Sequence, residues 1–213
     1  MNRVFDRALL KENAKEKIKG KIFNLLVANI IVMLLTGSVN TLPGLEQVVS
    51  IALLVMNIGL SFFYLNFLDK GEMNYMDLFY SFNFKDLNIY FNHLGTILVK
   101  YLLVFLWTLL LIVPGIIKSI AYSQINYIRA DKSDLEIMQC LRESEELMYG
   151  HKMEYFVLQL SFIGWYLLCG ITLGLACIYV LPYHSTVMAM YYRYLCSINH
   201  ETTEEDFKSN SEL

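Results

Sequence analysis

Charged residues are scarce in this sequence: Asp, Glu, Lys and Arg make up 17% of the 213 residues, whereas hydrophobic residues make up 56%. A nucleic-acid-binding protein needs a dense Lys and Arg face, and the formal net charge here is −3, so we expect no nucleic-acid partner. The apolar residues lie in blocks of about 20 and not in short amphipathic repeats. The sequence therefore predicts an integral membrane protein.

Recognisable catalytic and metal-binding patterns are also missing. The sequence contains no H-E-x-x-H, no G-x-S-x-G, no P-loop and no G-x-G-x-x-G. No C-x-x-C pair occurs among its four cysteines, Cys140, Cys169, Cys177 and Cys196. We interpret them as packing residues and expect neither a metal site nor a disulfide. The sequence thus predicts a protein without catalytic residues or a cofactor.

Proline is rare, and each of the three prolines bears on a predicted turn or kink. The pairs Pro43-Gly44 and Pro114-Gly115 each separate two apolar blocks, and such a pair favours a turn because it cannot easily continue a helix. Pro182 lies inside the last apolar block, where it removes one backbone donor.

The apolar blocks predict an all-α polytopic bundle of about six transmembrane helices in three hairpins, within a single domain at residues 22–198. The predicted spans cover residues 22–42, 48–68, 94–113, 115–130, 153–172 and 176–195. The segment 115–130 is the weakest of these, since it is short and polar and needs neighbouring helices to shield it. The aromatic-rich stretch 69–93 is expected to lie at the membrane interface without crossing it.

Three further segments are expected in the cytoplasm. Residues 1–21 combine Val4, Phe5, Ala8 and Leu9 with seven Lys and Arg, a pattern typical of a basic amphipathic helix on an anionic membrane surface. Residues 133–149 predict an amphipathic helix, opened by a capping box at 133–136 and closed at Gly150. Residues 199–213 predict an acidic, disordered tail.

The positions of Lys and Arg test this arrangement. The proposed cytoplasmic segments hold 15 of the 17 Lys and Arg residues, whereas the proposed outside turns hold only Lys118. By the positive-inside rule, this distribution predicts a multi-pass plasma-membrane protein with both termini in the cytoplasm.

A few polar side chains at membrane depth form the one candidate site. Lys118, Gln124 and Asn126 lie in the fourth predicted span and His184 in the sixth. Such groups are costly in a bilayer and often functional, so one hypothesis is a polar pocket between these two spans. The other is that they make interhelical hydrogen bonds that only hold the bundle together.

Several segments resemble one known family. They are Leu106-Trp107, the run 110–118, Tyr122-Ser123, Gly150-His151-Lys152, the run 160–165 and Leu181-Pro182-Tyr183. They are similar to the domain of unknown function 975 family of bacterial integral membrane proteins. The resemblance covers nearly the whole chain, most specifically 106–183. It is looser at 10–14, where the family tends to have Leu-Lys-Gly-Asn-Trp. It implies a bacterial plasma-membrane protein and transfers no activity.

The leading functional hypothesis is a non-enzymatic accessory or scaffold subunit of an envelope or export system, because the predicted outside turns are short and the cytoplasmic segments substantial. Its partners would be membrane lipids and either another membrane protein or a second copy of the chain. The runner-up is a small transporter or channel past Lys118, Gln124, Asn126 and His184. A lipid-active intramembrane enzyme is less favoured, because no nucleophile and base stand at a suitable spacing.

Overall fold

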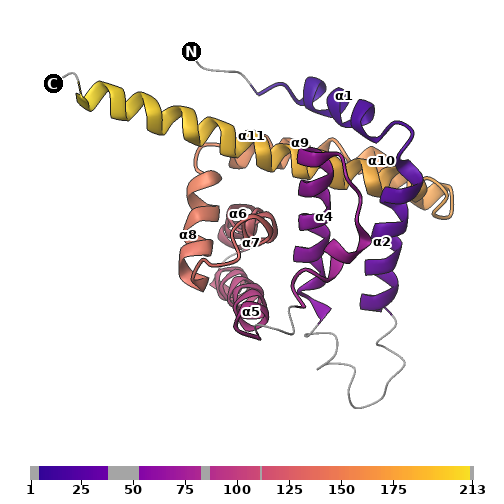
Figure 1. Cartoon of the computed structure of the whole chain (residues 1–213), viewed down its shortest axis with the longest axis horizontal. Coiled ribbons are helices and arrows are strands. Elements are labelled where there is room, and N and C mark those ends of the chain that lie inside the picture. The colour runs from indigo at the N-terminus through magenta and orange to yellow at the C-terminus, as the bar shows by residue number, and fades with distance from the viewer. Residues whose placement is uncertain (1–4, 38–52, 83–86, 111, 212–213) are drawn as a thin grey trace.

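The computed structural model in Figure 1 describes residues 5–37, 53–82, 87–110 and 112–211, and within these ranges every regular element is a helix. The predicted all-α class is therefore confirmed. The elements are α1 (Arg7–Ile18), α2 (Ile22–Gly37), α4 (Met56–Lys70), the short 3-10 helix η2 (Tyr75–Phe79), α5 (Leu87–Leu110), α6 (Ile112–Ala121), α7 (Ile125–Asp131), α8 (Ile137–Leu147), α9 (Lys152–Leu160), α10 (Ile163–Ile171) and α11 (Cys177–Ser211).

The N-terminal helix α1 lies along α11 (Figure 1). Asp6 caps it by accepting hydrogen bonds from the amides of Ala8 and Leu9, at 2.8 and 3.2 Å. The side chains that α1 buries are Leu10, Ala14 and Ile18. The predicted segment is thus helical, but the side chains that it buries are not those expected to form its apolar face. The buried positions face protein, whereas Leu9 remains 54% exposed.

Lysines of α1 and of the turn after it hold the end of α4. Lys17 donates to the carbonyl of Leu68 at 3.2 Å, and Lys21 donates to the carbonyl of Gly71 at 3.4 Å. The last carbonyls of a helix lack partners within the helix and carry partial negative charge, so a cation there is favourable. These contacts fix α1 across the end of the α2–α4 pair.

The stretch predicted to lie at the membrane interface packs in part against α4. Residues 75–80 run back along this helix, and the carbonyl of Leu78 occupies the space where a Cβ on Gly59 would sit, 1.9 Å away. Tyr80 stacks on Phe62 with ring centres 4.0 Å apart. Aromatic rings bury large areas when they stack in this way. Part of the stretch that was expected at the membrane interface is therefore packed against protein.

Helices α5 and α6 form a close hairpin, but its turn is not at Pro114-Gly115. Both residues lie inside α6, where a proline in the first turn costs no internal hydrogen bond. Gly115 instead permits the hairpin to close: a Cβ there would lie 2.2 Å from Thr108 Oγ1 and 2.7 Å from Thr108 Cα. The other predicted turn, Pro43-Gly44, lies outside the described residues.

The fourth predicted span, 115–130, is divided. A turn at residues 122–124 separates α6 from α7, which has only 7 residues. The next helix, α8, also begins later than predicted, at Ile137 and not within 133–136. The side chain of Gln139 accepts a hydrogen bond from the amide of Glu136 at 3.3 Å, so Glu136 and not Ser133 precedes the first turn.

The fifth predicted span, 153–172, consists of α9 and α10 with a break at residues 161–162. A tight turn then leads into α11, with Leu173 at φ 50° and Gly174 at φ 91°. Gly170 and Gly174 make no close helix contact, since a Cβ on either would meet nothing within 4 Å. The Gly-x-x-x-Gly spacing therefore serves the turn and not helix association.

The last helix is longer than predicted. Helix α11 continues through Pro182 and through residues 199–211, which were expected to be disordered, and its end projects beyond the other helices in Figure 1. Residues 183–213 contain neither glycine nor proline, so nothing in the sequence terminates the helix. At 35 residues, α11 is roughly 52 Å long.

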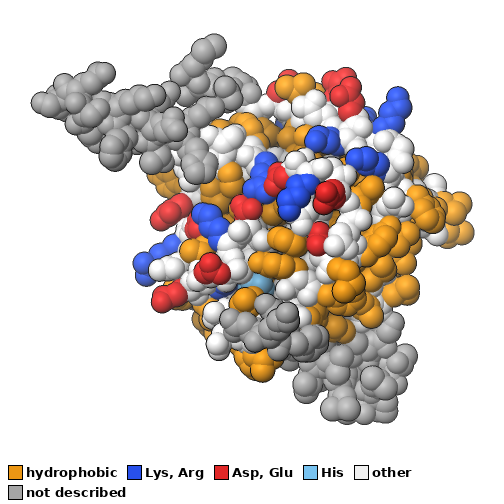
Figure 2. Space-filling view, in the orientation of Figure 1, with side chains coloured by type: hydrophobic (Ala, Val, Ile, Leu, Met, Phe, Trp, Pro, Cys, Tyr) orange, Lys and Arg blue, Asp and Glu red, His pale blue; other side chains and the backbone are white. Residues whose placement is uncertain are grey.

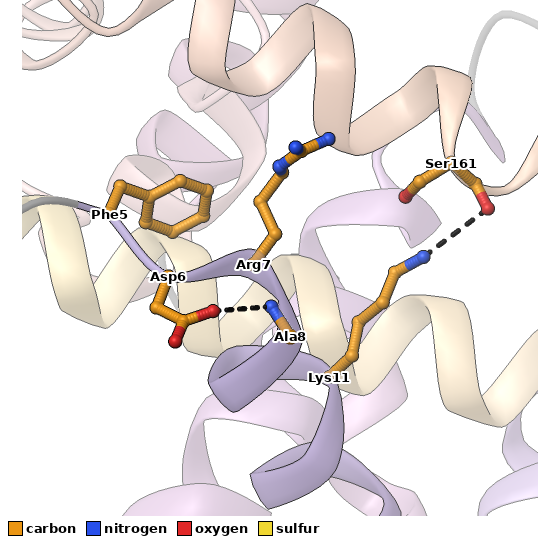
Figure 3. A pocket seen from close by; sticks show the side chains of 6 residues that line it. All are labelled: Phe5, Asp6, Arg7, Ala8, Lys11 and Ser161. Carbon is orange, nitrogen blue, oxygen red and sulfur yellow. Dashed lines mark hydrogen bonds between the residues drawn. The ribbon is translucent and has the colours of Figure 1, made fainter.

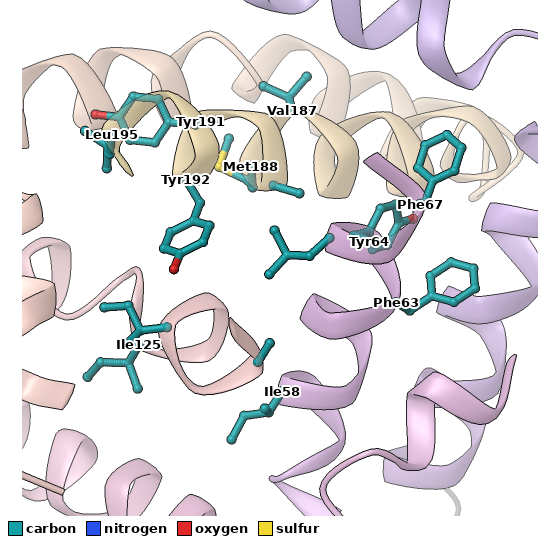
Figure 4. Packing of buried hydrophobic residues seen from close by; sticks show 14 of the residues in the cluster. Ile58, Phe63, Tyr64, Phe67, Ile125, Val187, Met188, Tyr191, Tyr192 and Leu195 are labelled. Carbon is teal, nitrogen blue, oxygen red and sulfur yellow. The ribbon is translucent and has the colours of Figure 1, made fainter. Parts of the chain in front are cut away.

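The core lies between α11 and the helices beneath it. Figure 4 shows Tyr192 of α11 pointing toward α7, with Met188 beside it, whereas Val187 lies on the other side of α11. Opposite them lie Tyr64 and Ile125, both with at most 1% of their surface exposed. Helix α11 thus packs its buried side chains against several other helices.

The described residues contain two helical stretches long and apolar enough to cross a membrane, at 87–109 and 152–171. A third exists if α1 and α2, bent by 96°, form one broken span. Six spans in three hairpins are not supported. The reasons are visible in the elements: α4 has 15 residues, α6 has 10, and α11 contains Pro182, His184 and Arg193 in its first half.

Large apolar side chains nevertheless gather on the surface. They are exposed on the second half of α2, on the facing ends of α5 and α6, and on α10 and the turn that follows it; Leu173 is 95% exposed and Leu167 is 66% exposed. In Figure 2 hydrophobic side chains cover the right-hand side, where α2 and α10 lie, whereas charged side chains lie at the centre, left and top. Such a division is typical of a surface that meets both lipid and water.

Gly115→Ala is expected to destabilise the protein by about 1–3 kcal/mol, because the added methyl group collides with the backbone of α5. Thermal unfolding in mild detergent, followed by far-UV circular dichroism, measures the change. Gly170→Ala is the matched control, since its methyl group meets open space. Equal melting temperatures for the two variants would contradict the close α5–α6 contact.

Candidate functional site

The structure places the four predicted site residues on three separate elements. Lys118 lies on α6, Gln124 and Asn126 lie at the start of α7, and His184 lies on α11. No hydrogen bond or ion pair joins any two of these four described side chains. The polar residues of the fourth and sixth predicted spans thus do not converge on one pocket, and each has its own surroundings.

Lys118 forms an ion pair with Glu145 of α8. Its ammonium group also lies 5.6 Å from the ring centre of Trp107 and 5.5 Å from that of Tyr122, within cation–π range. Burial raises the pKa of Glu145, but hydrogen bonds from Lys118 and Tyr122, together with the charges of Lys118 and Lys152, outweigh burial and lower it. Lys118 therefore joins α6 to α8.

His184 is joined to α9. Its Nε2 lies 3.2 Å from the side-chain oxygen of Gln159, whose amide group donates to the hydroxyl of Tyr155 at 2.9 Å. The ring of Phe162 packs edge-on against the imidazole, with ring centres 4.8 Å apart. These contacts connect α11 to both sides of the α9–α10 break.

Gln124 and Asn126 make no side-chain hydrogen bond to another helix among the described residues. Gln124 donates to the hydroxyl of the adjacent Ser123 at 2.8 Å, while its own side-chain oxygen is buried without a hydrogen-bond partner among the described residues. Asn126 is half-buried beside it. An unsatisfied buried acceptor is costly, but neither Gln124 nor Asn126 lines the groove between α5, α6 and α9 or the pocket beside α1, so we assign the pair no ligand.

A shallow groove of about 360 Å³ does open nearby, between α5, α6 and α9. Its walls are mostly apolar, with polar groups from Thr108, Ser119, Tyr155 and Gln159. Gln159 connects this groove to His184 of the predicted site. The groove lies on the same surface as the exposed apolar side chains of α5 and α6, so its shape suits apolar chains better than a soluble metabolite.

The most deeply buried charge was not predicted. Arg129 of α7 is completely buried; its Nε donates to Thr96 Oγ1 of α5 at 2.8 Å, and its Nη1 donates to the carbonyl of Leu135 at 2.5 Å. No carboxylate pairs with it among the described residues. In the sequence, Arg129 stands next to Asp131 and Lys132, where a basic residue indicates a cytoplasmic surface, so no pattern could have revealed its burial.

A second unpredicted network joins the ends of α4 and α7 to the middle of α11. Arg193 of α11 donates to Asp131 at the end of α7, at 3.0 Å, and also forms an ion pair with Asp69 near the end of α4. The hydroxyl of Tyr192 donates to the same Asp131 carboxylate at 3.1 Å. This network gathers charged groups at one end of the bundle.

A neutral contact joins α2 and α4 to the first half of α11. The side-chain amide of Asn29 on α2 donates to the hydroxyl of Tyr64 on α4 at 2.6 Å, and its oxygen accepts from Ser185 of α11 at 3.3 Å. Interhelical hydrogen bonds of this kind stabilise membrane bundles modestly. Among the described residues, no group of three or more His, Cys, Asp or Glu side chains is arranged to hold a metal ion, and all four cysteines are free.

Comparisons with known proteins give one match. A family model described as Protein of unknown function (DUF975) matches residues 89–199, which extend from α5 into α11. No curated protein and no solved structure matches the chain.

Replacing Glu145 by Gln should lower stability at neutral pH and much less in acid. The lowered pKa of Glu145 means that its ionised form stabilises the fold above the ordinary value of 4.5, and this contribution disappears as the pH falls through the folded pKa. Melting temperatures of wild type and Glu145→Gln should therefore converge below about pH 4.5. Glu143→Gln, which breaks the more exposed pair with Lys132, is the control. A gap that stays constant with pH would refute this role.

Proposed function

The chain belongs to the family described as Protein of unknown function (DUF975), and from that premise we propose that it is a non-enzymatic, multi-pass protein of the bacterial plasma membrane, acting as an accessory or scaffold subunit of an envelope or export system. The match covers most of the segments that carry the family resemblance in the sequence. The family description assigns no reaction, so the proposal is derived from this chain's own residues.

One observation supports a scaffold over a transporter: the polar groups that a solute would need are already paired between helices. Lys118 is held by Glu145, and His184 is held by Gln159. A transport path requires side chains that can exchange partners with the solute as it passes. Here the pairs join α6 to α8 and α9 to α11, which is what a rigid membrane scaffold requires.

The distribution of charge supports the membrane location. No Asp, Glu, Lys or Arg occurs from residue 155 to residue 192, a stretch that contains most of α9, all of α10 and the first half of α11. The exposed apolar side chains of α10 continue this uncharged surface. Seven Lys and Arg residues precede residue 22, which favours a cytoplasmic N-terminus by the positive-inside rule.

The partner contact that we favour is the projecting end of α11. From residue 199 onward the sequence carries five acidic residues and one lysine. A helix that extends beyond the body of the protein with this composition offers negative charge to a basic surface of a cytoplasmic or membrane-bound partner.

Topology can be measured with reporter fusions. A reporter that is active only outside the cytoplasm is expected to be inactive at either terminus and active when inserted after Leu173, in the exposed turn between α10 and α11. Termini on opposite sides would contradict the proposed arrangement.

A partner can be tested by co-purification in mild detergent from the native host. Changing Glu204, Glu205 and Asp206 together to Lys is expected to abolish capture of the partner, because the charge of the projecting helix reverses. The control changes Lys19, which is exposed on the other terminal segment, to Glu. The scaffold proposal fails if no protein depends on the acidic end, or if reconstituted vesicles show a solute flux that Lys118→Ala and His184→Ala both reduce.

A further inference from the structure

A pocket lies between the first turn of α1 and the break between α9 and α10. It measures about 480 Å³ and opens to the surface. Figure 3 shows the six side chains that line it, five from the N-terminal segment and Ser161 from the break. Residues about 150 positions apart therefore build one concavity, which exists only when α1 is docked.

Its charge is positive. Arg7 and Lys11 stand one helical turn apart on the same face of α1, and Figure 3 shows both side chains extending toward the α9–α10 break. The carboxylate of Asp6 is already used as the helix cap. Arg7 has no hydrogen bond or ion pair with any other described residue. Two cations thus face the pocket against the single carboxylate of Asp6, which forms no ion pair with either of them, so the lining keeps a net positive charge.

Lys11 is fixed in position, but its ammonium group can still donate further hydrogen bonds. Its ammonium group donates to the carbonyl of Ser161 at 3.3 Å and lies 4.1 Å from the ring centre of Phe162. An ammonium group has three protons to donate, so a further acceptor can bind beside the carbonyl. The break at 161–162 supplies that carbonyl, because the end of α9 leaves it without a helical partner.

The pocket also lies where charged and uncharged surfaces meet. On α9, Lys152 and Glu154 precede it in the chain, whereas no charged residue follows from 155 to 192. The side chains next to the break, Leu160 and Ile163, are 44% and 57% exposed. In a bilayer, phosphate groups occupy this boundary between charged and apolar surfaces.

We propose that this pocket binds the phosphate of an anionic phospholipid headgroup between Arg7 and Lys11. A guanidinium group matches phosphate oxygens with two parallel hydrogen bonds, and the ammonium group adds a point charge. The glycerol and acyl chains of the lipid then continue over the exposed apolar side chains of α10. The proposal depends on the membrane location described above and on no protein partner.

Lipid retention on the purified full-length chain, measured by native mass spectrometry, tests this assignment. Phosphatidylglycerol, phosphatidylcholine and inorganic phosphate are added in separate arms. We expect phosphatidylglycerol to be retained preferentially, and Arg7→Gln or Lys11→Gln to weaken its retention roughly tenfold. Lys19→Gln removes the same charge from an exposed position outside the pocket and should alter retention by less than about twofold.

Three results would overturn the proposal: equal retention of the two lipids, equal losses in Arg7→Gln and Lys19→Gln, or displacement of phosphatidylglycerol by inorganic phosphate at matched concentration. The last would indicate a site for a free anion. Far-UV circular dichroism confirms that each variant is folded, so a loss of retention reports on the pocket. A protein that stays in membranes yet shows no lipid preference fails this proposal and leaves the scaffold proposal intact.

Discussion

The packing of α11 is the contact on which the rest of the structure depends. This helix touches α1, α2, α4, α8 and α10, and its buried face carries Tyr183, Val187, Tyr191 and Tyr192. Apolar side chains alone give membrane helices little preference for one neighbour over another, because lipid tails are equally apolar. Polar pairs supply that preference here. Ser185 donates a hydrogen bond to Asn29, and His184 pairs with Gln159. Arg193 forms ion pairs with Asp69 and Asp131.

The helical class and the limits of several helices could be predicted because they depend on local sequence. Apolar blocks indicated the approximate positions of α5, α10 and the first half of α11. The number of spans could not be obtained in this way. Hydropathy reports how apolar a segment is, but a break such as that at residues 161–162 or the turn at 122–124 depends on tertiary contacts. Lys11 donates to the carbonyl of Ser161, and Ser144 donates to the carbonyl of Ala121 next to the turn.

The candidate site shows the same limit at the level of single residues. The sequence singled out Lys118 and His184 as polar groups in apolar blocks, and in the structure both make interhelical contacts. Their partners, Glu145 and Gln159, lie 27 and 25 residues away in the chain. Arg129 shows the opposite error. Its charged neighbours in the sequence indicated an exposed position, whereas its side chain is completely buried. Sequence distance does not reveal such pairings, because they are set by which helix faces meet.

The contact between α1 and α11 has a consequence for biosynthesis. Helix α1 is made well before α11, so the contacts of Phe5 with Tyr191 and of Lys15 with Tyr183 form only after those residues of α11 have been made. Domains usually begin to fold from the N-terminus during synthesis. Helix α1 can therefore complete its packing only late in the synthesis of this chain, and Lys11 can donate to the carbonyl of Ser161 only after the end of α9 has been made.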